Sequence, residues 1–442
     1  MYKFPVKCVA FVMACFAFGT ATAQTSSGYS NPTAGRENNP YSKYGIGELW
    51  NGNPTALRGM GSITSAYGDP FVINTDNPAS YSWLTMTTFQ GGAVASYRSI
   101  TNAAGAAYTS STASIGYLNI GFPLNNKKGG FALGLRPVSR SYYALADTTQ
   151  TVLGTTVRAY SGDGGLNYGF IGGAYRIKDF SLGFNLGYLF GNYRSFESVN
   201  DTFRPRQSYV AQFSNYNRIG GLYWKGGVLY SHSIHDTGLT ISVGATVALG
   251  QNLNERVSQY QVAIYNFGDT IVNDTSASSG ERKGKLTMPF SGSIGVMLSS
   301  TDKWRVGIDY SMANWSNYKS TVDSSMNLAI GKSSYKLALG GEYTPNSQDI
   351  TSYFSRVSYR GGLYIGKDYV QLHNTALPVY GVTLGASLPY KRNVRVPSKL
   401  HLSMDIGRIG THDNNLVSQT YVRFGLGLTF NQQRWGIPVK YD

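Results

Sequence analysis

The chain has 442 residues, of which 14% are charged, and it carries a formal net charge of +15, 53 glycines and 34 tyrosines. A soluble surface normally has about a quarter to a third charged residues, so this composition disfavours a secreted soluble domain. No apolar stretch after residue 23 reaches the roughly 18 residues that a membrane helix needs, which leaves strands as the means of crossing a bilayer.

Residues 1–23 have the organisation of a secretory signal peptide. Two lysines and an apolar run that ends at Phe18 are followed by small residues of the Ala-x-Ala type. A lipoprotein site at Cys15 is the alternative, but this residue lies inside the apolar run. Both cysteines, Cys8 and Cys15, belong to this segment, so the mature chain has no thiol for a disulfide or a metal site.

Residues 24–84 lack sustained alternation of apolar and polar residues. They contain NPYSKYGIGELW at 39–50 and LRGMGSITSAYGDPFVINTDNPAS at 57–80, where aromatic and aliphatic residues are interspersed with glycine. Such side chains need a place to pack, and a wide barrel left empty would be an aqueous channel. We therefore expect this segment to form a plug, or hatch, in the lumen of a barrel.

From Thr85 onward, apolar residues recur at every second position, which is the period of a strand. In residues 181–190 and 239–249, Leu, Ile, Val and Phe alternate with small or polar residues, as a lipid-facing strand with a polar lumenal side requires. A sheet in hydrocarbon must also close, because an open edge leaves backbone groups unpaired. The sequence thus predicts an all-β fold, a transmembrane antiparallel β-barrel of about 14 strands over residues 85–430. The strands are expected at 85–98, 111–123, 130–142, 164–177, 180–194, 216–233, 237–251, 285–299, 302–314, 333–344, 353–366, 379–389, 398–408 and 418–430.

The connections between these strands alternate between short turns and long segments. The long ones, 143–163, 195–215 and 252–284, are expected to be external loops, because outer-membrane barrels have short periplasmic turns. An even number of strands returns both ends of the chain to the periplasm. We therefore expect an outer-membrane protein with a periplasmic C-terminal tail at residues 431–442.

The start of the mature chain resembles the FadL/TodX family of outer-membrane transporters for hydrophobic compounds. The residues that carry the resemblance are Gly59, Gly61, Asp69 and the turn Asn77, Pro78 and Ala79, just before TTFQGGAVASY. The resemblance implies an N-terminal hatch that hands over, at Asn77, Pro78 and Ala79, to the first strand of a fourteen-stranded barrel. An ordinary Asn-Pro turn is the alternative. The stretches NPYSKYGIGEL and RWGIPVKYD are also similar to barrel proteins of the Bacteroidota, whose hatch-bearing members need not be transporters.

The family resemblance also implies a kink in the third strand, which opens a side exit for ligand. Here the third strand reads GGFALGLRPVSRSYY, and Pro137 cannot donate a hydrogen bond to the ladder. We therefore expect a kink or bulge at Arg136 and Pro137. A bulge that only shapes the wall is the alternative.

Charged and polar residues on the lumenal side of the strands are expected to form a network that faces the plug. They are Arg305, Asp309, His401, Ser403, Asp405 and Arg423. Three of them have the residue types of a hydrolase triad, but same-face neighbours on one strand lie about 6.5–7 Å apart, too far for its short hydrogen bonds. We therefore expect no catalytic residue, metal site or cofactor, and no enzyme.

Two functions from different classes remain open. The first is passive transport of small hydrophobic molecules, fatty-acid-like or aromatic, through a plugged barrel with a lateral exit. The alternative is a structural subunit of an outer-membrane assembly or secretion complex, with Tyr-rich loops at 195–223 and 252–284 and the tail at 431–442 as partner surfaces. Scattered basic residues and an export signal exclude nucleic acid, and the phosphates of outer-membrane lipid and lipopolysaccharide are the expected counter-charges.

Overall fold

The structure is a computed structural model and describes residues 38–124, 128–151, 154–201, 209–234, 237–265, 270–274, 281–300, 303–349, 351–390 and 398–432. These residues all belong to one compact unit, Gly35–Asp442. The expected signal peptide at 1–23, and the expected tail apart from Asn431 and Gln432, lie outside them. No helix in the described part of the chain is long and apolar enough to cross a membrane.

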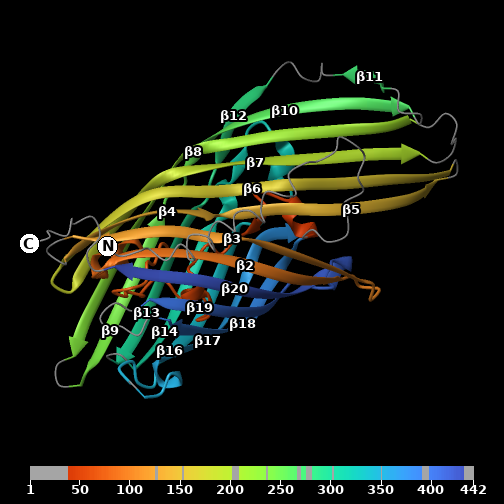
Figure 1. The fold of residues 1–442 in the computed structure, drawn as a ribbon. Helices are drawn as coiled ribbons and strands as arrows, with labels where there is room; N and C mark the ends of the chain where they lie inside the picture. The colour runs from red at the N-terminus through yellow and green to blue at the C-terminus, as the bar shows by residue number, and fades with distance from the viewer. Residues whose placement is uncertain are drawn as a thin grey trace, which may run out of the picture. The chain divides into compact units, whose positions relative to one another are not determined.

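Antiparallel strands form a closed barrel, and the described residues give its wall 14 strands, as predicted (Figure 1). The ladder from Thr87↔Gln432 to Thr101↔Ser418 closes the ring between the first and the last wall strand. In wall order the strands are β2 (Thr87–Thr101), β3 (Ala107–Pro123), β4 (Gly129–Pro137) continued by β5 (Ser139–Thr151), β6 (Gly154–Ile177), β7 (Phe180–Asp201), β8 (Tyr209–Ile234), β9 (Leu239–Ala248) continued by β10 (Asn252–Tyr265), β12 (Arg282–Thr287) continued by β13 (Phe290–Ser300), β14 (Trp304–Asn314), β16 (Ser333–Tyr343), β17 (Ser358–Leu372), β18 (Thr375–Pro389), β19 (Lys399–Ile409) and β20 (Ser418–Gln432).

Short elements complete the described fold. They are β1 (Glu48–Leu49), β11 (Thr270–Asp274), β15 (Lys319–Ser320), the helix α2 (Thr55–Arg58) and the 3-10 helices η1 (Pro40–Lys43), η2 (Pro78–Trp83), η3 (Trp315–Asn317), η4 (Ser324–Asn327), η5 (Phe354–Arg356) and η6 (Asp413–Asn415). We term the end of the barrel at which β2 begins and β20 ends the base, and the opposite end the rim.

The outer surface of the wall follows the alternation of the sequence. On β7, Leu182, Phe184 and Leu186 are exposed, whereas Ser181 and Asn185, which have the opposite parity, are buried on the inner side. Apolar side chains also project outward from the other wall strands, for example Leu363 and Ile365 on β17. Because water does not tolerate so large an apolar surface, the outer face is built for contact with hydrocarbon.

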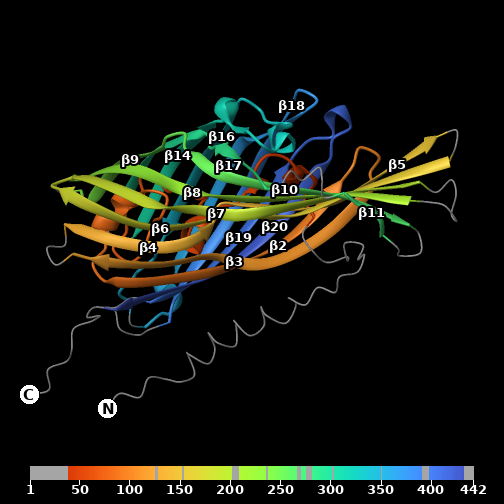
Figure 2. The same ribbon diagram turned by 90° about the horizontal axis from the view of Figure 1, so that it is seen from above.

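Three segments that the sequence analysis assigned to loops are mostly strand. Residues 143–163 form most of the β5–β6 hairpin, 195–215 contain the paired ends of β7 and β8, and 252–284 contain β10, β11 and the start of β12. We term the described residues of 145–161, 195–215 and 258–274 the rim extension. Figures 1 and 2 show β5–β8 and β10 continuing together towards the rim. The loop prediction was wrong because strands beyond the bilayer pair without an apolar face.

Residues 38–84, the described part of the N-terminal segment, contact inward-facing residues around the ring. α2 contacts β18, β19 and β20, whereas η2 contacts β4, β6, β7 and β8. At two wall glycines the approach is so close that an added Cβ at Gly340 would lie 2.5 Å from the Met60 carbonyl oxygen, and one at Gly362 would lie 2.4 Å from the Gly61 nitrogen. Glycines on the inner face therefore make room for the backbone of the segment.

Candidate functional site

The junction between the N-terminal segment and the wall is organised by Asn77. Its side-chain oxygen accepts a hydrogen bond from the Ala79 nitrogen at 3.0 Å and caps η2, and Pro78 occupies the first position, where no N–H is needed. The side-chain nitrogen donates to the Val228 carbonyl of β8 at 3.0 Å. A Cβ at the neighbouring Gly227 would lie 2.2 Å from the Asn77 side-chain oxygen. The three predicted junction residues thus lie where the segment is attached to β8.

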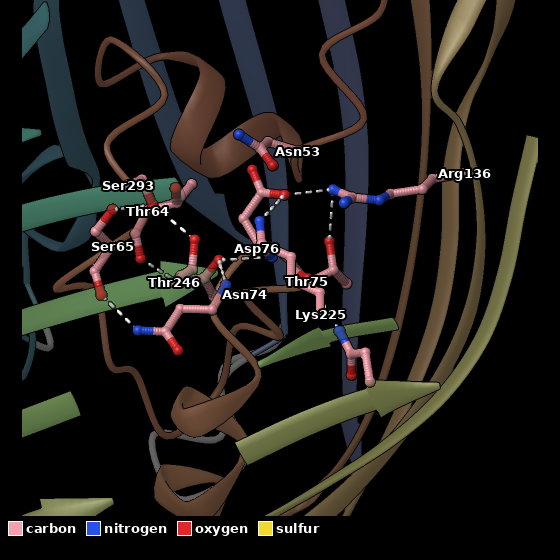
Figure 3. Close-up of polar contacts among 12 residues, drawn as sticks. Asn53, Thr64, Ser65, Asn74, Thr75, Asp76, Arg136, Lys225, Thr246 and Ser293 are labelled. Carbon is pink, nitrogen blue, oxygen red and sulfur yellow. Dashed lines mark hydrogen bonds and ion pairs between the residues drawn. The ribbon is translucent and has the colours of Figure 1, made fainter. Parts of the chain in front are cut away.

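Arg136, on the third wall strand, extends into the barrel towards the segment (Figure 3). Its guanidinium lies 2.7 Å from Asp76 and donates to the Thr75 hydroxyl at 3.4 Å. Lys225 of β8 lies 3.5 Å from the same carboxylate. Burial raises the pKa of Asp76, but Lys225 and Arg136 outweigh it and hold the pKa well below its usual value. The carboxylate is therefore ionised and joins the segment to β4 and β8.

The third wall strand is interrupted next to Pro137. β4 ends with Pro137 opposite Asn167 of β6, and the β5 ladder resumes with Ser141 opposite Gly164. The third strand therefore uses one residue more than β6 over this stretch, which is the geometry of a bulge. Gly164 has φ +142°, a backbone conformation that glycine adopts readily.

Towards the rim, the wall has a gap between β3 and β5. The ladder between β3 and β4 stops at Leu118↔Leu135, and no ladder pair among the described residues joins the rest of β3 to β5. A cavity of about 980 Å³ lies at this gap, between residues of β2 and β3 on one side and of β5 and β6 on the other. The backbone hydrogen bonding of the wall is therefore interrupted at this place.

The N-terminal segment covers the β5 edge of the gap. β1 pairs with Ser139 and Arg140, and the Trp50 nitrogen donates to the Val138 carbonyl at 2.8 Å. Nearer the rim, Asn38 bonds β5 at the Ala144 carbonyl (2.9 Å) and β3 at the Ser110 hydroxyl (3.2 Å). These contacts place Asn38 between the two edges near the rim, whereas Gln432 ends β20 at the base. The side on which each end of the chain lies stays a prediction.

Arg140 crosses the gap from β5. Its guanidinium donates to the Ile115 carbonyl of β3 at 3.2 Å and lies over the Trp50 ring, 4.1 Å from the ring centre. A guanidinium stacked on an indole is held by both its charge and its flat surface. The protein's own residues thus bridge the opening in the wall.

A buried ion cluster around Glu48 forms the second attachment of the segment. The carboxylate accepts hydrogen bonds from Arg98 of β2 at 2.6 Å, from Arg423 of β20, and from Asn39 at 2.7 Å. Burial raises the pKa of Glu48, but the two guanidinium groups outweigh this effect and lower the pKa to about 2. The sequence analysis missed Glu48 and Arg98. The available signal was an arginine at an inward position of the first strand, which needs a counter-charge.

Arg305 and Asp309 of β14 both contact the segment, at different places. Arg305 lies 2.8 Å from Asp69, and the Asp309 carboxylate accepts hydrogen bonds from the backbone nitrogens of Thr64 (2.7 Å) and Ser65 (2.9 Å). The two residues therefore form separate attachments, and no ion pair joins them among the residues that the structure describes.

The three polar residues of β19 are divided between two cavities. Ser403 and Asp405 line a lumenal cavity of about 450 Å³, and Asp405 lies 3.9 Å from Arg423. His401 lines a different cavity of about 300 Å³ near the base, where its ring bonds the hydroxyls of Ser387 and Thr429 on the neighbouring strands. No group of three or more His, Cys, Asp or Glu within the described ranges is placed to hold a metal ion.

The lumenal cavity has charged groups from both the segment and the wall. Residues that line it include Glu48, Arg58, Asp76, Lys225, Asp309, Lys336, Asp405 and Arg423. Burial, followed by the charge of Arg423, lowers the pKa of Arg58 to about 10, so this arginine stays cationic at neutral pH. Such a lining favours water and polar groups over an apolar guest.

The fold is shared with solved outer-membrane channels. The CymD monoaromatic hydrocarbon channel matches with a TM-score of 0.52 and 13% identity over 88% of this chain and 99% of its own. The Pseudomonas putida toluene transporter TodX matches with 0.52 and 13% over 86% and 99%. A Pseudomonas aeruginosa FadL homologue matches with 0.53 and 13% over 87% and 99%. At this identity the likeness establishes the FadL-type outer-membrane barrel fold and no more.

Comparison at the level of sequence gives a more specific assignment. No curated protein matches the sequence significantly. One family model does match, and it covers residues 6–442, nearly the entire sequence. The chain belongs to the BamG family.

Proposed function

We propose that this protein is a structural subunit of an outer-membrane protein complex, in which the FadL-type barrel serves as a scaffold and does not transport. The observation that carries this proposal is the fixed attachment of residues 38–84 by two ion clusters, a buried one at Glu48 and a partly buried one at Asp76. A route for cargo through the barrel requires this segment to move, and a lumen held by such clusters resists that movement.

The energetic argument concerns both the segment and the cargo. Separating Glu48 from Arg98 and Arg423 leaves charges unpaired in a buried site, at a cost of about 3–5 kcal/mol. An apolar molecule in the lumenal cavity would also displace water from ionised side chains without replacing its hydrogen bonds. Both terms oppose hydrophobic transport.

The rim extension is the surface that we assign to a protein partner. It displays aromatic side chains on both faces, including Phe196, Phe213 and Tyr260, each about 40% exposed. Aromatic residues are enriched at protein interfaces, where they bury a large area at a small entropic cost. A partner in the outer membrane or outside it can reach this surface without entering the barrel.

The proposal is tested by purifying the tagged protein in mild detergent. The wild-type protein is expected to retain a fixed stoichiometry of other envelope proteins. In a matched variant, residues 196–214 are replaced by a two-residue turn, so that the last pair of β7 and β8 is Ser195↔Asn215. This variant should fold as a barrel and lose the partners. A wild-type protein that purifies alone under these conditions would contradict the scaffold function.

Passive transport of small hydrophobic molecules is the second candidate, and the gap between β3 and β5 favours it. In this alternative, residues 38–84 act as a hatch, the junction Asn77, Pro78 and Ala79 is its hinge, and ligand leaves towards the bilayer beside Arg136 and Pro137. The cavity of about 980 Å³ at the gap is large enough for a monoaromatic or fatty-acid-like molecule.

A reversible crosslink separates the two candidates. The hydroxyls of Ser65 in the segment and Ser293 in β13 lie 2.7 Å apart, and the mature chain has no cysteine of its own. In the Ser65→Cys/Ser293→Cys variant, oxidation fixes the segment to the wall. A transporter should then lose uptake of a hydrophobic tracer and regain it on reduction, with each single-cysteine variant as the control. Uptake that is the same in both redox states would exclude gating by this segment.

A further inference from the structure

A row of cations crosses the outward face of neighbouring strands near the rim. Arg256 of β10 lies directly opposite Arg218 of β8 on one side and directly opposite Lys283 of β12 on the other. All three side chains are exposed on the outer side of the wall, whereas the flanking Asn217 and Glu255 are buried on the inner side. Arg194 of β7 and Lys285 of β12 lie beside this row on the same face.

Such a row is unfavourable by itself. Directly opposed residues of an antiparallel ladder have Cβ atoms about 4.5–5.5 Å apart, and like charges in these positions destabilise a sheet. Two carboxylates lie nearby, Asp163 at 2.8 Å from Arg194 and Glu281 at 3.4 Å from Arg256. Within the described part of the chain, Arg218 and Lys283 form no ion pair. The row therefore presents an excess of positive charge that an external anion would neutralise.

The height of the row on the barrel indicates which anion meets it. On β8, Leu222, Gly220 and Arg218 are successive positions on the outer face, in order towards the rim. Leu222 is 66% exposed. On β7, the exposed Phe190 lies opposite Gly220, and the polar Asn192 that follows lies opposite Arg218. The cations thus begin where the apolar band ends. Lipid phosphates lie at this level, immediately outside the hydrocarbon.

We propose that Arg218, Arg256 and Lys283, flanked by Arg194 and Lys285, bind the phosphate groups of a membrane lipid in the rim-side leaflet. With the rim outside the cell, as the sequence predicts, this lipid is a phosphorylated glycolipid of the outer leaflet. Arginine is suited to the role because its planar guanidinium forms paired hydrogen bonds with phosphate oxygens. The inference depends on the membrane position of the barrel and holds for a scaffold and for a transporter alike.

The test measures binding of diphosphorylated lipid A and of its dephosphorylated form to the full-length protein in a neutral detergent, by native mass spectrometry. The variant Arg218→Gln/Arg256→Gln/Lys283→Gln removes the row. The matched control Arg158→Gln/Lys303→Gln/Lys332→Gln removes the same charge from exposed positions elsewhere. Heat-induced loss of the compact electrophoretic form verifies that each variant is folded.

Wild type and control are expected to bind the phosphorylated lipid about 10-fold or more tightly than the dephosphorylated lipid, and the row variant should bind both alike. Equal binding of both lipids by the wild type, or full discrimination by the row variant, would overturn the proposal. Displacement of lipid A by inorganic phosphate alone would assign the row to a free anion. Loss of a co-purified protein from the row variant, with lipid binding intact, would assign it to a protein partner. Either of the last two results also overturns the lipid assignment.

Discussion

The barrel and its rim extension are built from the same strands, but they obey different rules. The lower part of β7 alternates Leu182, Phe184 and Leu186 with small or polar residues, and its upper part, from Asn192 to Ser198, does not. The pairing with β8 nevertheless continues without a register shift from Phe180↔Tyr230 to Asn200↔Val210. Alternation in the sequence therefore reports contact with lipid on one face and not strand formation itself.

The largest loss of stability is expected when an ion pair inside the barrel is removed, and it is compared with removal of an ion pair on the outer face near the rim. Glu48→Ala leaves Arg98 and Arg423 buried beside each other without their carboxylate. We expect a loss of about 3–5 kcal/mol in the free energy of unfolding, measured by denaturant titration in detergent micelles.

The matched control is Asp163→Ala. This residue also forms a short pair, with Arg194 at 2.8 Å, but both side chains are more than one third exposed. We expect a loss of only about 0–1 kcal/mol. Equal effects of the two substitutions would mean that the Glu48 cluster is accessible to water, and would remove the main argument for a fixed N-terminal segment.

A second comparison uses two adjacent glycines of β8 that point to opposite sides of the wall. A Cβ at Gly227 would lie 2.2 Å from the Asn77 side chain and 2.8 Å from Pro78, whereas at Gly226 the nearest atom lies 3.8 Å away. Gly227→Ala should therefore destabilise the protein by about 1–3 kcal/mol through overpacking, and Gly226→Ala should be nearly neutral. Thermal loss of the compact electrophoretic form reports both, and a neutral Gly227→Ala would show that the junction is not packed against β8.

The sequence predicted the parts of this molecule that the bilayer constrains. The strand expected at 333–344 is β16, Ser333–Tyr343. The two ranges agree because apolar and polar residues alternate over the part of this strand that faces lipid, which is nearly all of it. The strand expected at 216–233 is β8, Tyr209–Ile234, and residues 209–215, which the prediction left out, lie in the rim extension. The lumenal Arg423 was recognised, but Glu48, its partner, lies in a segment without periodicity. Pairing between distant residues of this kind leaves no local pattern to read.

A smaller effect is expected from Pro137→Ala, which tests what keeps the wall open between β3 and β5. The substitution restores a backbone donor, but the β5 edge remains covered by β1 and by Asn38. The free energy of unfolding should change by less than about 1 kcal/mol, chiefly because alanine allows the unfolded chain more freedom. Within residues 109–116 of β3, the amides that point towards the gap and not towards β2 should continue to exchange fast. New protection there would show that the proline, and not the N-terminal segment, prevents β3 from pairing with β5.

The last comparison concerns the pH dependence of the Glu48 cluster. Burial opposes ionisation of Glu48, but Arg98 and Arg423 lower its pKa from 4.5 in the unfolded chain to about 2. A group whose pKa is lowered by folding stabilises the protein above its unfolded pKa and loses that contribution as the pH falls towards the folded value. The difference in unfolding free energy between wild type and Glu48→Gln should thus be constant from pH 7 to pH 5.5 and decline below about pH 4.5. A decline that begins near pH 6 would mean that the carboxylate is not held by both guanidinium groups.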